Sequence, residues 1–567
     1  MSSIRITGLA TGIDTDQMIK DLMKVERAKV DRVQQDKQVL QWRQELYNSI
    51  NKDFANFILN TKKEFGLSGS TSTGAIFNKS LSSLNWVKRA VSSNESAVKV
   101  STTSEAVNGS YDVTVHRLAD GVKAASSANI TKDGGNSENL ASQFEGLTEG
   151  DIIRFRINDK EFSFNGTDKI SDVVKQINAS DAGVQVSYDA SIDRFFIQTT
   201  TTGENAVLKV DALYDFNPET GTGTYSDAGQ KFIEALKLNV TSYDDNGNLI
   251  PEALGIETTY KGVDAKITFN GAENITKSTN QFTINGINLD LRTTGSTTVR
   301  VDTDTDAVYD KIKGFVDKYN EIVDKMGKLL GEKQYRDYRP LTAEQKEAMK
   351  EKEIELWEEK AKSGLLRNDS IISSTMQNLR NSLYNGVEGI EGPFKALYEI
   401  GIDTEKWAAG AIGGKLEIDE EKLRKAISED VDGVLDLLFK EAGPVPAKDA
   451  NGNLIPGETV EGKGGVITRM YNTMIEGMKQ IVNKAGPGEE SSLFRNINSK
   501  IMIDFVTNYG SISMLDKDIS DIDNRISDLN ALLIRKEDKY YNQFAAMEKF
   551  VQQMNNQGSW LMQQLGM

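Results

Sequence analysis

Both ends of the chain carry stripes of residues at helical spacing that a lone helix cannot bury. Near the C-terminus apolar residues recur at heptad spacing and continue after a stutter, at Leu515, Ile519, Ile522, Ile526, Leu529, Leu533, Tyr540, Phe544, Met547, Val551 and Met554. Near the N-terminus Asp14 or Thr15 can cap a helix whose stripe runs through Ile19, Leu22, Glu26, Val30, Val33, Lys37 and Leu40, and after a slip of register through Tyr47, Ile50, Phe54 and Phe57. An isolated helix would leave such a stripe in water, so we expect the two ends to pack together or against neighbouring subunits.

The proline distribution supports long helices at both ends. The chain contains eight prolines. The first is Pro218 and none follows Pro487, so the ends lack the strongest helix breaker. We predict that contacts with partners or other copies are made by Leu9, Ile13, Ile19, Leu22, Val30, Val33, Leu40, Leu529, Leu533, Tyr540, Phe544, Met547, Val551, Met554, Trp560, Leu561 and Leu565.

Residues from about 85 to 301 have a different pattern, with period-two alternation, many Thr and Ser residues, and Asn-Gly pairs that favour tight turns. This region is predicted to be β-rich. Strands near 97–100 and 111–115 are expected to be joined across Asn108-Gly109.

A compact ββαββ unit is predicted inside this β-rich region. Its elements are two strands, a short helix and two further strands, at 153–157, 162–164, 170–177, 184–188 and 195–197. Helical periodicity returns at Val308, and a capping box at Thr342 and Gln345 begins a further helix.

The order of these elements predicts an α+β multidomain protein in which β-rich head domains are inserted into a coiled-coil or helical-bundle stalk. A chain of 567 residues is too long for one hydrophobic core. The predicted domains are terminal coiled-coil segments at 1–42 and 535–567 that are mobile in the monomer, a helical stalk at 43–84 and 302–534, a β-rich head domain at 85–125 and 260–301, and an inserted ββαββ head domain at 126–259.

Charge and composition argue against several classes of partner. A net charge of -17 opposes binding to nucleic acid or to an anionic membrane, because both need clustered Lys and Arg. No window of 18 consecutive apolar residues predicts membrane insertion, and the first residues lack the pattern of a secretory signal. Cysteine is absent, so disulfides and thiolate ligands are excluded.

Patterns of catalytic and metal-binding residues are incomplete. His116 is the only histidine, which excludes multi-histidine metal sites, and no G-x-S-x-G sequence accompanies it. Gly413-Gly414-Lys415 resembles part of a phosphate-binding loop, but Leu416 stands where Ser or Thr should bind magnesium. We interpret this segment as a turn before a strand at 416–418 and a helix from Asp419.

Acidic clusters give no stronger signal. Asp302, Asp304 and Asp306 have the spacing of a calcium loop, but Ala307 replaces the glycine and Lys313 the bidentate glutamate. The sequence therefore predicts no catalytic residues, no metal site and no cofactor.

Several segments resemble flagellar filament cap proteins, the hook-associated protein 2 family. The opening GLATGIDTDQMIKDLMKVERAKVDRVQQDKQVLQWRQELYNSI is similar to the family's N-terminal segment. DTDAVYDKIKGFVDKYNEIVDKM, SGLLRNDSII, IGIDTEKWAAGAIGGKLEIDEEKLRKAI and the final heptad helix occur in the family's order. KISDVVKQINASDAGVQVSYD resembles a small module of flagellin-like and hook-associated proteins.

The resemblance implies a secreted protein that crosses the flagellar type III export channel unfolded, without a cleaved signal peptide. It then implies a homo-oligomeric ring, most simply a homopentamer, at the distal filament tip, where flagellin is inserted beneath it. The implied partners are flagellin, the hook-filament junction proteins, and the flagellar export chaperone and export apparatus.

Other readings are compatible with this sequence. Flagellin and hook-filament junction proteins share the arrangement of terminal helices around inserted β domains. A stalked surface adhesin would place glycan or host-protein binding on the β-rich region, and that role could coexist with capping. A glycan hydrolase on a stalk would need two carboxylates in one cleft.

Overall fold

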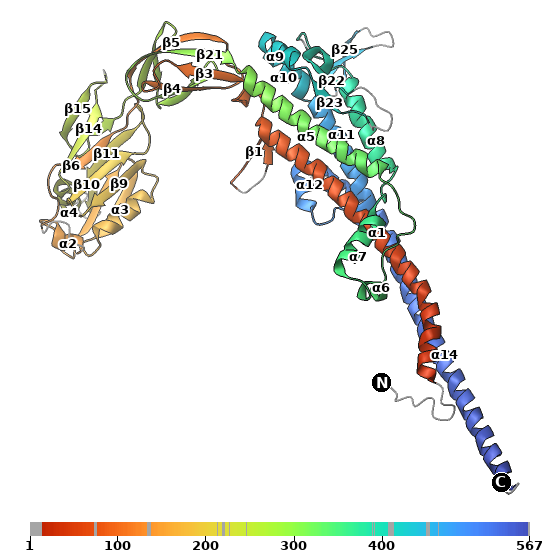
Figure 1. Ribbon diagram of the computed structural model, residues 1–567. Helices are drawn as coiled ribbons and strands as arrows, with labels where there is room; N and C mark the ends of the chain where they lie inside the picture. Colours follow the sequence, from red (N-terminus) through yellow and green to blue (C-terminus); the bar gives the residue numbers. More distant parts are fainter. Residues whose placement is uncertain are drawn as a thin grey trace. The chain divides into compact units, whose positions relative to one another are not determined.

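The computed structural model describes residues 14–72, 76–132, 138–212, 214–217, 222–225, 227–244, 247–387, 389–390, 392–405, 413–448, 454–462 and 464–564 (Figure 1). Contacts divide the chain into two compact units, Met1–Leu81 with Thr305–Met567, and Ser82–Asp304. We call the first unit the stalk and the second the head. Long helices near both ends and β-rich central domains confirm the predicted α+β class.

The first stalk helix begins where the sequence predicted. α1 spans Thr15–Phe65, and the side chain of Asp14 accepts a hydrogen bond from the Gln17 backbone N–H at 2.9 Å. The helix ends at Gly66, whose φ of 75° lies in the left-handed region that glycine adopts most readily. The predicted continuation of the stripe is confirmed, because all four of its members are buried: Tyr47, Ile50, Phe54 and Phe57.

The proximal half of α1, residues 42–65, packs into a helical bundle. Its neighbours are α5 (Thr305–Gly331) and α11 (Val466–Ala485), and α8 (Ser370–Tyr384) packs against both. Aromatic rings fill the centre, with the Phe57 and Phe315 centroids 5.4 Å apart. The buried Tyr471 hydroxyl lies 2.7 Å from the Thr61 hydroxyl, so this core contains a paired polar contact as well as apolar surface.

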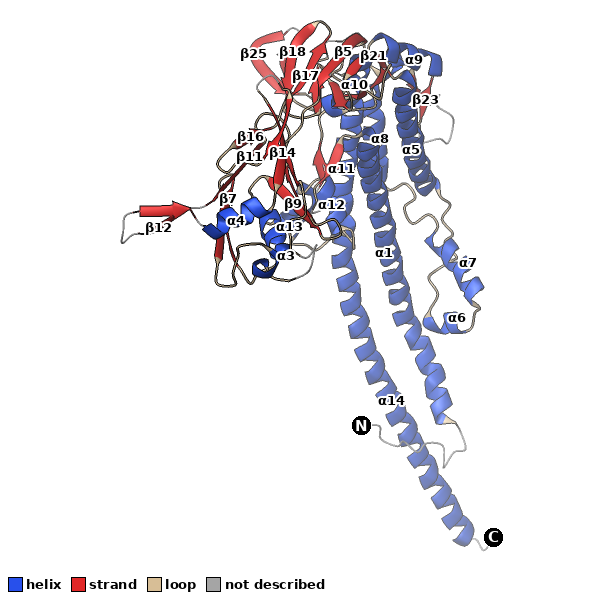
Figure 2. Cartoon of the chain, turned by 90° about the vertical axis from the view of Figure 1, so that its left-hand side faces the viewer, coloured by secondary structure: helices blue, strands red, loops and turns tan. Residues whose placement is uncertain are grey.

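The last stalk helix, α14 (Met514–Gln564), runs alongside α1 (Figure 1, Figure 2). Figure 2 shows α14 continuing past the first turn of α1. The two helices are antiparallel, because Lys37 of α1 pairs with Asp523 of α14 and Glu26 of α1 pairs with Lys536 of α14. Segments from opposite ends of the chain therefore pack against each other.

The capping box at Thr342 is confirmed, since the Thr342 N–H donates to Gln345 Oε1 and the Gln345 N–H to Thr342 Oγ1. The strand and helix predicted after the Gly413 turn are also confirmed. The other stalk elements are β1 (Ser68–Ser70), β2 (Ile76–Asn78), α6 (Ala343–Glu347), α7 (Glu351–Lys362), η2 (Leu397–Ile400), β22 (Ile402–Thr404), β23 (Leu416–Ile418), α9 (Glu420–Glu429), α10 (Val431–Phe439), β24 (Pro444–Lys448), β25 (Leu454–Glu461), α12 (Ser491–Ile497) and α13 (Lys500–Tyr509).

The head contains two bodies, each with its own core. In the outer body, two antiparallel sheets of order β18-β17-β5-β21-β3 and β19-β20-β4 share one core. Its strands are β3 (Lys88–Ser92), β4 (Val98–Thr102), β5 (Gly109–Arg117), β17 (Ala265–Phe269), β18 (Ala272–Lys277), β19 (Gln281–Ile284), β20 (Ile287–Leu291) and β21 (Gly295–Thr303).

The expected hairpin across Asn108-Gly109 is wrong. β4 and β5 follow each other in the chain, but β4 pairs with β20, whereas β5 pairs on both edges with β17 and β21. A local turn signal was overridden by these non-local pairings, which complete the sheet.

The inner body is built from the sheets β15-β14-β6-β10-β9 and β16-β11-β7-β8. The two sheets share a second core, in which Phe155 and Phe232 stack with centroids 5.6 Å apart. The elements are β6 (Lys123–Ser126), α2 (Leu140–Gln143), β7 (Ile152–Ile157), β8 (Lys160–Asn165), α3 (Ile170–Asn178), β9 (Val184–Asp189), β10 (Arg194–Thr199), β11 (Val207–Ala212), β12 (Tyr214–Asn217), β13 (Thr222–Tyr225), α4 (Asp227–Ala235), β14 (Leu238–Tyr243), β15 (Leu249–Ala253) and β16 (Thr259–Lys261).

The ββαββ order is present as β7, β8, α3, β9 and β10. Its four strands do not form one sheet, however. The β7–β8 hairpin belongs to the four-stranded sheet and the β9–β10 hairpin to the five-stranded sheet, while α3 supplies Val173 and Ile177 to the common core.

The chain enters and leaves the inner body at neighbouring points. Asp120 and Val263 form an antiparallel bridge, with both N–H···O distances at 2.9 Å. Gly262 is required there, because a Cβ atom would lie 2.5 Å from the Asp120 carbonyl oxygen and 2.6 Å from that of Gly203. The two bodies of the head are therefore joined by close backbone contact.

The predicted domain limits fall inside five elements: 42/43 in α1, 125/126 in β6, 259/260 in β16, 301/302 in β21 and 534/535 in α14. The boundary between 125 and 126 cuts through β6. Ala124 of this strand and the preceding residue Val122 belong to the core of the inner body. The boundary between 301 and 302 cuts through β21. The remaining limits, and the mobility of 1–42 and 535–567 in the monomer, stay predictions.

Candidate functional site: the paired terminal helices

Three side-chain contacts fix how α1 and α14 are aligned. Lys37 Nζ lies 2.6 Å from Asp523 Oδ1, and Lys536 Nζ lies 2.5 Å from Glu26 Oε1. Gln44 Nε2 donates to Asp516 Oδ1 at 2.7 Å. The residue numbers of each pair add to 560 or 562, which defines an antiparallel register along the whole contact.

The structure brings eight of the predicted contact residues into this seam. Ile19, Val30 and Val33 are buried on α1, and Leu40 is half-buried. On α14 the half-buried members are Leu529, Leu533, Tyr540 and Phe544, whereas the half-buried Val551 lies beyond the described part of α1. The expectation that the two ends pack together is therefore met within one chain.

One predicted contact residue lies outside the seam between α1 and α14. Leu22 is 41% exposed, whereas its neighbour Met23 is 4% exposed and occupies the seam. Two adjacent apolar residues leave the heptad phase ambiguous, and the sequence reading chose the residue that faces outward.

The remaining predicted residues lie away from the seam or outside the described part of the chain. Met547, Met554, Trp560 and Leu561 are exposed. Leu9, Ile13 and Leu565 lie outside the described residues.

Past about residue 547, α14 extends beyond the described part of α1. The register places Thr15, the first residue of α1, opposite the neighbourhood of Met547. The 17 residues from 548 to 564 continue as helix, a length of about 25 Å at 1.5 Å per residue. We call this segment the overhang.

The overhang carries large apolar side chains in water. Phe550, Trp560 and Met562 are 60%, 58% and 63% exposed. Apolar groups gathered at the end of a helix are typical of an interface rather than of a core.

A second exposed stripe lies on α1, and of its members the sequence analysis named only Leu22. Met18, Leu22 and Val25 are exposed and spaced by four and three residues, so they share one face beside the seam. The signal was present in the sequence, but only the stripe that became the seam was assigned. This face and the overhang together form the candidate interface.

Glu26 is a charged residue in a mainly apolar seam. A hydrogen bond from Lys536, and then one from Lys29, lowers the pKa of the Glu26 carboxyl. The carboxylate is consequently held in its charged form between the helices.

Residues 332–368 pack against the proximal half of α1 on another side. Trp42 packs with Ala361 and Leu365, and Arg43 Nε donates to the Leu365 carbonyl at 3.1 Å. The Tyr47 hydroxyl donates to Asp369 Oδ2 at 2.5 Å, and burial followed by this carboxylate raises the pKa of Tyr47. These contacts anchor α1 where the exposed distal half begins.

Family models match three parts of the chain. The flagellar hook-associated protein 2 C-terminus matches residues 262–556, the flagellar hook-associated protein 2 N-terminus matches 11–121, and the flagellin hook IN motif matches 147–201. Flagellar hook-associated protein 2 of Halalkalibacterium halodurans is 30% identical over 99% of this chain and 99% of its own length. The chain belongs to the flagellar hook-associated protein 2 family.

The chain is also similar to two more distant proteins. Flagellar hook-associated protein 2 of Thermotoga maritima is 26% identical over 73% of this chain and 54% of its own length. The flagellar cap protein of Escherichia coli, solved as its D1-D2-D3 domains, is 20% identical, with a TM-score of 0.47, over 77% of this chain and 95% of that one. The flagellin hook IN motif covers the elements from β7 to β10, the module whose resemblance the sequence had indicated.

As a member of this family, the chain is a structural flagellar cap protein and not an enzyme. His116 sits on β5 with its Nε2 2.8 Å from the Thr268 hydroxyl, an exposed contact between neighbouring strands. Among the described residues no group of His, Asp or Glu is arranged to hold a metal ion. None of the described helices combines the length and apolarity needed to cross a bilayer.

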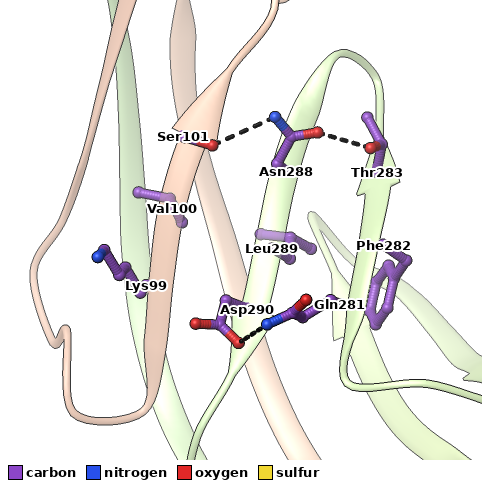
Figure 3. Close-up of a pocket in the computed structure, with 9 residues that line it drawn as sticks. All are labelled: Lys99, Val100, Ser101, Gln281, Phe282, Thr283, Asn288, Leu289 and Asp290. Atoms are coloured by element: carbon purple, nitrogen blue, oxygen red, sulfur yellow. Dashed lines mark hydrogen bonds between the residues drawn. The ribbon is translucent and has the colours of Figure 1, made fainter. Parts of the chain in front are cut away.

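A shallow hollow on the outer body of this hook-associated protein 2 is lined by polar side chains that bind one another (Figure 3). Asn288 donates to the Ser101 hydroxyl at 3.2 Å and lies 2.6 Å from the Thr283 hydroxyl, while Gln281 donates to Asp290 at 3.2 Å. These cross-strand pairs occupy the groups that a ligand would need, so the hollow is a solvated sheet face.

Proposed function

We propose that this hook-associated protein 2 sits at the distal tip of the filament, where its paired terminal helices bind other axial subunits and promote insertion of exported flagellin. The observation that carries the proposal is the exposed apolar surface of the overhang and of the α1 face. A helix pair that buries one seam and leaves a second apolar face in water is suited to join a larger helical assembly.

We further propose a homo-oligomeric ring, with the homopentamer as the expectation carried by the family resemblance. A closed ring needs two different faces on each subunit that meet after one rotation, and a multidomain subunit supplies them. The head contributes most of the like-charge repulsion, since residues 82–304 carry 31 acidic and 20 basic residues, a net charge of -11 out of -17.

The ring and its electrostatics are tested by light scattering of the full chain at micromolar concentration. Salt shortens the Debye length from ~30 Å at 0.01 M to ~8 Å at 0.15 M, so we expect oligomers at the higher ionic strength and monomer at the lower. A monomer at both would contradict the ring. Oligomers that persist unchanged at low salt would contradict only the electrostatic part.

Export by the flagellar type III route, unfolded and without a cleaved signal, is part of the same proposal. It is supported by the absence of cysteine, which removes the hazard of crosslinking before assembly. The expected partners are the export apparatus, its chaperone, the hook-filament junction proteins and flagellin.

Adhesion by the head is kept as a secondary role. Among the head residues whose burial is described, Phe196 is the large aromatic side chain that is exposed, at 37%. A head with a net charge of -11 disfavours anionic glycans. Binding of the full chain to a neutral glycan array would support this role, whereas an empty array would remove it.

The central proposal is tested by deleting residues 560–567. We expect the shortened protein to fold and to be exported, because its bundle is intact, but to cap poorly, with most filament length lost in cells that lack the natural cap. Trp560→Ala with Leu561→Ala should reproduce this loss. A matched control is Gln552→Ala with Gln553→Ala, which changes two exposed polar residues of the same overhang. Full filament length with either the deletion or the apolar double variant would contradict the proposal.

A further inference from the structure

The seam between α1 and α14 contains one layer of opposite charges. Glu26 stands at a seam position between Met23 and Val30, and Lys536 at one between Leu533 and Tyr540. The register places the two side chains in the same layer, joined at 2.5 Å and only 18% and 31% exposed. Layers on either side are apolar.

A second charge lies one and a half heptads away. Lys37 is at a seam position of α1, is 28% exposed, and reaches Asp523 on the flank of α14 at 2.6 Å. Both charged seam residues of α1 are therefore matched by opposite charges on α14, and only in this antiparallel alignment.

The apolar seam residues alone would not select this partner. Aliphatic side chains such as Val33 and Leu529 fit many helix pairs. In a ring, copies are related by rotation about one axis, so equivalent helices can meet side by side and parallel. Pairing of two α1 helices would then bring Glu26 against Glu26 and Lys37 against Lys37, and pairing of two α14 helices would bring Lys536 against Lys536.

We propose that Glu26 and Lys536 determine partner choice, holding α1 against α14 and disfavouring exchange into α1–α1 or α14–α14 pairs between copies. Charged or polar residues at seam positions specify partner and orientation in coiled coils, at some loss of stability. The proposal rests on the proposed homo-oligomer, in which copies come close enough to exchange helices. Neighbouring copies then meet the intact helix pair through its outer face.

The absence of cysteine makes the test direct. Val33→Cys with Leu529→Cys, which the register places opposite each other, reports pairing within one chain through a short thiol crosslinker. Val33→Cys alone reports α1–α1 pairing, because its crosslink can only join two copies. With the natural charges we expect an internally crosslinked monomer from the first variant and little covalent dimer from the second.

Glu26→Leu with Lys536→Leu removes the charged layer while keeping the seam apolar. In this background the dimer formed through Val33→Cys should rise about tenfold or more, the factor that corresponds to about 1.4 kcal/mol. Glu26→Lys with Lys536→Glu is the matched control. It keeps opposite charges in an α1–α14 pair and like charges in α1–α1 and α14–α14 pairs, so the yield of covalent dimer should stay low. Glu26→Lys alone should weaken the internal crosslink, and the exchange variant should restore it.

An unchanged dimer yield in the leucine background would overturn the proposal, as would abundant dimer with the natural charges. Circular dichroism of each variant verifies that the helices remain formed. Light scattering of the same samples tests the ring separately. If no variant oligomerises, the ring fails while the covalent dimer ratio in concentrated monomer still decides partner choice.

Discussion

The two halves of α1 lie on one continuous helix but are stabilised in different ways. Its proximal residues 42–65 include ten buried residues, whereas its distal residues 15–41 include five. The proximal half is surrounded by bundle helices and by residues 332–368. The distal half has α14 on one side and water on the other. Only the proximal half of α1 therefore has a complete core of its own.

The largest expected difference comes from the same substitution in each half. Ile50 and Ile19 are 0% and 1% exposed. Ile50→Ala should lower the free energy of unfolding of the stalk by about 2–5 kcal/mol, because a cavity is left in a core that cannot collapse. Ile19→Ala should change the same transition by less than about 1 kcal/mol, since the distal pair can open without the bundle.

Urea unfolding followed by circular dichroism measures both variants. Equal losses for Ile50→Ala and Ile19→Ala would show that the terminal pair unfolds together with the bundle, and the contrast between the halves would be lost.

The second prediction concerns hydrogen exchange. In dilute monomer, amides at Leu22, Val33, Phe544 and Val551 should exchange much faster than those of the proximal half, because opening there disrupts few buried contacts. Assembly should slow the distal amides and leave the proximal ones unchanged. Exchange that is equally slow in monomer and assembly at these four positions would contradict a role for partners in ordering the distal pair.

The smallest effect is expected from acid. The pKa of Glu26 is lowered by Lys536 and then Lys29, so its contribution is present above the ordinary glutamate pKa of about 4.3 and is lost as the pH falls through the lowered value. Acidification should therefore lower protection, the ratio of the intrinsic to the observed exchange rate, in residues 19–33 more than in the proximal half. Glu26→Gln should remove this excess, and an unaltered excess in that variant would assign the effect to other carboxylates.

Much of the stalk could be predicted from the sequence because its signals are local. Asp14 as the cap, the stripe through Phe57 and the capping box at Thr342 each depend on residues a few positions apart. Heptad spacing also identified α14 and its need for a partner. It could not decide between Leu22 and Met23, since both are apolar and only the geometry of the partner helix distinguishes them.

The head was less predictable because strand alternation does not identify strand partners. The order β7, β8, α3, β9, β10 was read correctly, but its assignment to two sheets depends on β6, β11, β14 and β16, which lie far away in sequence. The hairpin predicted across Asn108-Gly109 was wrong for the same reason, because the strands that pair with β4 and β5 are distant in sequence. Two residues of the candidate interface, Trp560 and Leu561, could be predicted because they are apolar residues in a polar stretch. Met18 and Val25 were not predicted, because the apolar stripe that forms the seam was the one stripe assigned to α1.

The bridge between Asp120 and Val263 makes the inner body of the head a removable module. The two strands of chain that lead into it are already hydrogen-bonded to each other, so joining residue 120 to residue 263 with a tight turn would leave the outer body's five-stranded sheet with its own register. A cassette of another sequence could be spliced at the same point without altering the strands beneath it. In such a lineage, the head could diversify by exchange of whole modules while the stalk changes only residue by residue.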